Sequence, residues 1–145
     1  PAAMELRKYV DTTLRRISQQ RYIRGTRSRN ANTILPVRWI VGFSKGKDVS
    51  TILTKLVMPG DTLWMVPFSQ PKEMPWIKCE SPASIARVAR ELPSIDSSVR
   101  LEEFDHLSDV VDRLAADTSD TQLNALCGSL YLVADAYREL HIQPF

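Results

Sequence analysis

The sequence predicts an α/β fold in which a mostly parallel, Rossmann-like sheet has helices on both faces. Apolar runs of strand length alternate with amphipathic stretches of about ten residues. This alternation is typical of βαβ units, in which a helix crosses from each parallel strand to the next. The chain has 145 residues, 43% of them hydrophobic, which is enough for one core. We therefore expect residues 1–145 to form a single domain.

The first segment, PAAMELRKYVDTTLRRI, predicts a helix because apolar side chains recur at helical spacing from Ala3 to Ile17. Proline suits the first turn of a helix, since it lacks the N–H group that would be unpaired there. A helix that begins at the first residue of a chain is unusual. We therefore expect further chain before Pro1.

Strands and helices alternate in the rest of the chain. The predicted helices have recognisable starts, with Asp48 and Ser81 as N-caps and Pro82 in a first turn. The final segment begins as a buried strand and becomes a helix at Gly128–Ser129, where glycine allows a sharp turn. The predicted strands lie in residues 37–43, 62–68, 98–104 and 121–127, and the helices in residues 48–57, 81–92, 105–117 and 129–140.

Ligands of such sheets bind beyond the carboxyl ends of the strands. Lys45, Lys47 and Lys72 lie near those ends, and Ser129 is expected to cap a helix there with an exposed hydroxyl. A helix N-terminus adds N–H donors and a favourable dipole, so these residues together predict an anion site. Solvated lysines and an ordinary N-cap serine explain the same pattern, and the residues alone leave both interpretations open. The strand-end segments are Ser44–Asp48, Pro67–Lys72, Phe104–His106 and Cys127–Tyr131.

The stretch WIVGFSKGKDVSTILTKL is similar to a phosphate-binding loop but lacks its spacing. Gly42 and Gly46 enclose three residues instead of four, and Asp48 stands where a Ser or Thr would bind Mg²⁺. The two histidines and two cysteines have no metal-ligand spacing, and no catalytic triad can be argued from the sequence. Cys127 lies in an apolar run and is expected to be a buried free thiol. The sequence therefore predicts no metal site and no catalytic residue in this chain.

The net charge of +2 conceals an uneven distribution. Residues 1–60 carry twelve Lys or Arg against three Asp or Glu, whereas residues 61–145 carry seven against fourteen. Six arginines fall between Arg15 and Arg29, which leaves a nucleic-acid-binding module as an alternative. No nucleic-acid motif accompanies them, so we expect residues 20–32 to form a flexible basic loop and nucleic acid not to be a partner.

The sequence contains no apolar run of membrane-spanning length, no signal-peptide pattern and no N-glycosylation sequon. Together with the few cysteines, this favours a reducing, intracellular compartment and no membrane partner. We expect a cytoplasmic location, with a mitochondrial pool left open.

Several stretches, taken in order, resemble the C-terminal domain of the folylpolyglutamate synthase and dihydrofolate synthase family of the Mur ligase superfamily. PAAMELRKYV is similar to the continuation of the family motif DGAHNP from its proline. IVGFSKGKDVSTIL, LWMVPFSQPK and GSLYLVAD are similar to the later strand-end motifs, and EMPWIKCESP favours the fungal dihydrofolate synthase type. Residues 21–30 depart from the family pattern as an insertion. The strand that ends in DGAHN would precede Pro1 and is expected to be a missing central strand.

The resemblance implies an ATP-dependent ligase that joins L-glutamate to dihydropteroate or a folate through an acyl phosphate. ATP and Mg²⁺ are then cofactors bound mainly by an N-terminal ATPase domain of the same protein, and this domain contributes to the nucleotide and glutamate sites. The isolated chain is expected to be inactive. The implied substrate-binding residues are Ser129 and Tyr131 for glutamate, Lys47 and Asp48 on the glycine loop, and Lys72, where the family more often has Arg.

Overall fold

The computed structural model describes residues 35–117 and 122–141. Strands and helices alternate through them as predicted. The predicted helix of residues 1–17, the basic loop of residues 20–32 and the Arg15–Arg29 cluster lie outside the described residues. The elements are β1 (Val37–Gly42), α2 (Val49–Leu56), β2 (Thr62–Met65), α3 (Pro82–Glu91), β3 (Arg100–Glu103), α4 (Leu107–Ala116), β4 (Leu123–Gly128) and α5 (Leu130–Glu139).

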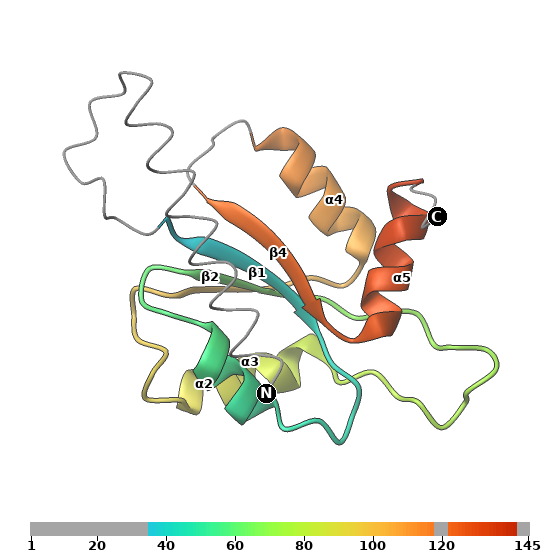
Figure 1. The fold of residues 1–145 in the computed structure, drawn as a ribbon, viewed down its shortest axis with the longest axis horizontal. Coiled ribbons are helices and arrows are strands. Elements are labelled where there is room, and N and C mark those ends of the chain that lie inside the picture. Colours follow the sequence, from blue (N-terminus) through green and yellow to red (C-terminus); the bar gives the residue numbers. More distant parts are fainter. Residues whose placement is uncertain (1–34, 118–121, 142–145) are drawn as a thin grey trace.

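The sheet has four strands in the order β3-β2-β1-β4, and every neighbouring pair is parallel. Helices α2 and α3 cover one face, and α4 and α5 cover the other (Figure 1). This confirms the predicted parallel α/β fold. The expectation of a missing central strand is wrong for the described sheet, because β1 pairs directly with both β2 and β4. A further strand would have room only beside β3 or β4.

Strand β1 is buried on both faces, which explains its continuous apolar sequence. Alternate side chains enter different cores. Val37, Trp39 and Val41 pack with α2 and α3, whereas Ile40 packs against the core under α4 and α5. Strand β2 ends at Met65, three residues earlier than predicted, and Pro67 follows it without an N–H for the ladder.

The predicted helix starts are confirmed. The Asp48 carboxylate caps α2 by accepting from the Thr51 N–H at 3.2 Å and the Thr51 hydroxyl at 2.7 Å. These hydrogen bonds lower the pKa of Asp48. The Ser81 hydroxyl caps α3 by accepting from the Ser84 N–H at 3.1 Å, with Pro82 in the first turn. None of the helices within the described ranges is long and apolar enough to span a bilayer.

Asp61 joins the amino ends of β1 and β2 and is almost fully buried. Its carboxylate accepts from the Val37 N–H at 3.0 Å, the Trp39 indole N–H at 2.9 Å and the Met58 N–H at 3.0 Å. The last bond closes the turn before β2, in which Gly60 has a φ of 88°. One side chain thus fixes the strand start, the largest core residue and the turn.

We expect Asp61→Ala to lower the free energy of unfolding by about 3–5 kcal/mol, because it leaves several buried N–H donors without an acceptor. Urea unfolding followed by tryptophan fluorescence measures the loss. Asp61→Asn should give a smaller loss, since its amide oxygen still accepts. Asp96→Asn, at an exposed turn, serves as the control and should leave the midpoint near that of the wild type. Equal midpoints for Asp61→Ala and Asp96→Asn would contradict the assigned role.

Candidate substrate-binding site

The candidate site lies at the carboxyl edge of the sheet, where all four strands end. The loop after β1 and the loop of residues 66–81 after β2 are joined there. Ser44 forms an antiparallel bridge with Cys79, and the Lys45 N–H donates to the Lys78 carbonyl at 2.7 Å. The Glu80 N–H donates to the Phe43 carbonyl at the same distance. These backbone bonds fix the path of two loops that carry lysines.

Glycines let β1 and β4 converge at this edge. Gly42 and Gly128 are paired in the sheet, and the Ser129 N–H donates to the Gly42 carbonyl at 2.8 Å. Gly128 has a φ of 110°, and a Cβ there would lie 2.2 Å from the Gly42 oxygen. The turn from β4 into α5 therefore requires glycine for both conformation and space.

Ser129 caps helix α5 as predicted. Its hydroxyl accepts from the Tyr131 N–H at 3.1 Å. The prediction of an exposed hydroxyl is wrong, because the residue is buried with 7% of its surface exposed. The exposed group at this position is the neighbouring side chain of Leu130, at 77%. Contact of a ligand with Ser129 thus requires approach along the edge of α5.

Lys72 and Tyr131 come together in one pocket of about 510 Å³ between the loop of residues 66–81 and α5. The Tyr131 hydroxyl lies 3.0 Å from the Met74 sulfur, and its ring packs against Phe68 with centroids 5.8 Å apart. The pocket presents a lysine, an arginine and an aromatic face, which suits an anionic organic ligand. Its lining residues are Ser69, Gln70, Pro71, Lys72, Tyr131, Ala134, Asp135 and Arg138.

Lys47 and Asp48 are outside the lining of this pocket, on the exposed loop before α2. Asp48 is occupied by its cap bonds to Thr51 and by a bond from the Ser50 hydroxyl at 3.1 Å. Helix capping therefore explains Asp48 without a ligand. Lys47 remains at the carboxyl edge with its ammonium in solvent, so its predicted role requires a ligand that extends beyond the pocket.

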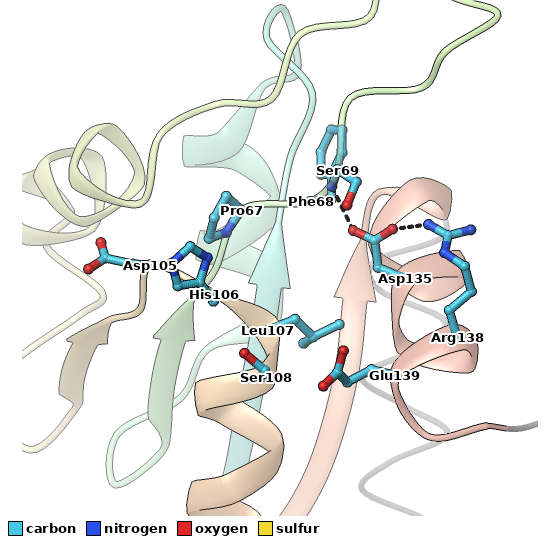
Figure 2. Close-up of a pocket in the computed structure, with 10 residues that line it drawn as sticks. All are labelled: Pro67, Phe68, Ser69, Asp105, His106, Leu107, Ser108, Asp135, Arg138 and Glu139. Carbon is cyan, nitrogen blue, oxygen red and sulfur yellow. Dashed lines mark hydrogen bonds and ion pairs between the residues drawn. The ribbon is translucent and has the colours of Figure 1, made fainter.

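Sequence reasoning missed Asp135 and Arg138. Figure 2 shows the Asp135 carboxylate between the Ser69 backbone and the Arg138 guanidinium. Both residues border the Lys72 pocket and a second pocket of about 410 Å³. The signal in the sequence was a carboxylate four residues after Tyr131, on the same helix face. The second pocket is lined by Pro67, Phe68, Ser69, Asp105, His106, Leu107, Ser108, Asp135, Arg138 and Glu139.

Metal ligands do not gather at this edge. Within residues 35–117 and 122–141, no three His, Cys, Asp or Glu side chains are arranged to hold a metal ion. The described donor set therefore does not fit Mg²⁺, and we derive no step through a metal here.

Comparisons with known proteins agree with this arrangement. The family model for the dihydrofolate synthetase C-terminal domain matches residues 1–139. The chain belongs to this family. It is also 33% identical over 142 residues to "Probable dihydrofolate synthetase" of Schizosaccharomyces pombe, an alignment that covers 97% of this chain and 29% of that protein. The chain thus spans less than a third of the length of this relative. No solved structure matches the chain.

The two cysteines of this family domain lie in different surroundings. Cys127 packs against the core under α2 and α3, and burial raises the pKa of its thiol from 9.0 to about 12. Cys79 lies in the loop of residues 66–81, where its sulfur is 3.4 Å from the Phe68 nitrogen. Burial also raises the pKa of Cys79, but the residue remains partly accessible. The predicted buried free thiol at Cys127 is confirmed.

We expect Gly128→Ala to destabilise the domain far more than Gly60→Ala. Both glycines have positive φ, so both substitutions incur backbone strain of about 1 kcal/mol. A Cβ at Gly60 meets no atom within 4 Å, whereas one at Gly128 collides with the Gly42 carbonyl. Thermal unfolding of the two variants isolates the collision. Similar midpoints for both would show that β1 and β4 can separate without cost.

We expect Cys79 to react with Ellman's reagent at pH 8 well before Cys127 in the native protein. A pKa of about 12 leaves only about one Cys127 thiol in 10⁴ as the reactive thiolate at that pH. Its rate should rise about tenfold per pH unit while the fold persists. Peptide mass spectrometry assigns the modified residue, and similar rates in denaturant provide the control. Equal native rates would contradict the burial of Cys127.

Proposed function

We propose that this chain is the C-terminal domain of an ATP-dependent ligase that joins L-glutamate to dihydropteroate. The observation that carries the proposal is the dihydrofolate synthetase family match over residues 1–139, together with the cationic pocket at the carboxyl edge. A folate as acceptor remains the alternative within the wider resemblance. The family description and the relative's name both favour dihydropteroate.

The proposed reaction has two steps. An oxygen of the pterin carboxylate attacks the γ-phosphorus of ATP, which forms an acyl phosphate and releases ADP. The amine nitrogen of glutamate then attacks the acyl carbon. The tetrahedral intermediate loses inorganic phosphate and the nitrogen loses a proton, which leaves an amide. Glutamate brings two carboxylates, so its site must supply cations and orient the amine.

The residues of this chain suit the glutamate part of that site. Lys72 and Arg138 border one pocket and can pair with a carboxylate, and the Tyr131 ring can pack against the aliphatic part of an amino acid. Lys47, outside the pocket, would contribute positive charge toward the acyl phosphate. Ser129 holds the α5 N-terminus, whose N–H groups favour an anion nearby.

The remaining chemistry is assigned to an N-terminal ATPase domain of the same protein. The glycine loop around Lys47 lacks the spacing of a triphosphate-binding loop. The described residues do not present a donor set suited to Mg²⁺. ATP and Mg²⁺ would bind chiefly to that other domain, and this one would complete the cleft from the opposite side.

A nucleic-acid-binding module built on Arg15–Arg29 was the alternative from another functional class. That cluster lies outside the described residues. No observation on the described residues favours this function, so we do not propose it.

We expect the full-length protein to form dihydrofolate from dihydropteroate, glutamate and ATP, and the isolated chain to form none. Lys47→Ala in the full-length protein should lower kcat/KM about tenfold or more, since it removes a cation from the reacting edge. Lys55→Ala, an exposed lysine on α2, is the matched control. A coupled phosphate-release assay with product chromatography measures turnover. Turnover by the isolated chain, or equal effects of the two lysine variants, would refute the proposed division of roles.

A further inference from the structure

The loop of residues 66–81 has no helix or strand of its own, yet it forms one wall of the Lys72 pocket. Segments without regular structure depend on a few anchoring contacts for local stability. Side chains of the described residues anchor this loop at three backbone or side-chain atoms. The Cys79 sulfur accepts from the Phe68 N–H, Asp135 accepts from the Ser69 N–H, and the Tyr131 hydroxyl meets the Met74 sulfur.

The anchor at Asp135 is the strongest of the three. Its Oδ2 accepts from the Ser69 N–H at 2.6 Å, whereas the other two anchors involve sulfur, at 3.4 and 3.0 Å. A hydrogen bond to a carboxylate is roughly twice as strong as one between neutral groups, and sulfur is a weak acceptor. The Asp135 side chain is only 10% exposed, so water competes little for this bond.

Asp135 and Tyr131 stand one turn apart on α5 and hold the loop on either side of Lys72. Asp135 binds Ser69, before the lysine, and Tyr131 meets Met74, after it. The other oxygen of Asp135 accepts from the Arg138 guanidinium, which is 68% exposed at the pocket rim. One carboxylate thus positions both cations of the pocket, Lys72 through the loop and Arg138 directly.

We propose that Asp135 is a positioning residue for the glutamate-binding pocket: it fixes the loop of residues 66–81 to α5 and so holds Lys72 and Arg138 in place for a substrate carboxylate. This inference rests on the proposed ligase function. It assigns Asp135 no contact with substrate. The carboxylate acts by limiting the conformations that the loop and the guanidinium can adopt before binding.

The test uses the full-length protein and five variants. Asp135→Ala removes the anchor, and Asp135→Asn keeps an amide oxygen for Ser69 but loses the charge that pairs with Arg138. Lys72→Ala and the double variant Asp135→Ala/Lys72→Ala test whether the two residues act together. Glu91→Ala removes an exposed carboxylate at the end of α3 and is the matched control.

The first measurement is hydrogen–deuterium exchange of peptides covering residues 66–74. Asp135→Ala should speed exchange there at least about tenfold, and Asp135→Asn by less, with Glu91→Ala unchanged. This measurement needs no enzymatic activity. Exchange at the wild-type rate in Asp135→Ala would overturn the anchoring role. If Asp135→Ala fails to fold, Asp135→Asn carries the comparison, and its unchanged exchange would overturn the role equally.

The second measurement is steady-state kinetics with glutamate as the varied substrate. Asp135→Ala should raise KM for glutamate about tenfold with kcat changed less than about twofold. The double variant should be no worse than Lys72→Ala alone, because the anchor acts through the lysine. An unchanged KM, or effects that multiply, would overturn the positioning role. Absence of glutamate-dependent turnover in the wild type would instead refute the proposed function, while exchange still decides whether Asp135 anchors the loop.

Discussion

The close approach of β1 and β4 at Gly42 and Gly128 is the constraint on which the candidate site depends. A Cβ on either glycine would lie within 2.7 Å of a backbone oxygen, so neither position tolerates a larger residue without backbone movement. The approach directs the chain from β4 straight into α5, with Ser129 bonded to Gly42. Helix α5 is thereby placed where Tyr131 and Asp135 reach the loop after β2. Without this pairing, the two walls of the pocket would not meet.

Local patterns in the sequence predicted most of the fold. Alternating apolar runs gave the parallel sheet with helices on both faces, and short polar side chains marked the helix starts at Asp48, Ser81 and Ser129. The order β3-β2-β1-β4 and the direct pairing of β1 with β4 were not predictable in the same way. They result from contacts between residues about eighty positions apart, which no local pattern records. The error over a missing central strand has this origin.

The candidate site was predictable only in part, for a related reason. Parallel strands end at one edge, so lysines after β1 and β2 were expected there. Which of them share a pocket depends on the path of residues 66–81, and that segment has no periodicity from which to infer it. Lys72 joins Tyr131, whereas Lys47 and Asp48 lie elsewhere on the edge. Ser129 was expected to be exposed because capping and burial cannot be separated from sequence. Asp135 resembled any carboxylate on a solvated helix face.

Stability and ligand contacts are concentrated at opposite ends of the sheet. At the amino end, Asp61 is buried with its bonds directed to the strand start, the core tryptophan and a turn. At the carboxyl end, Asp135 is nearly as buried, but its partners are a loop N–H and an exposed guanidinium. The same side-chain type thus supports the fold in one place and an adaptable surface in the other. What distinguishes them is the partner: Asp61 bonds to elements already fixed by the sheet and core, while Asp135 bonds to groups that little else holds. Loss of Asp135 should therefore cost local order more than global stability, which is the signature of a residue that serves a site.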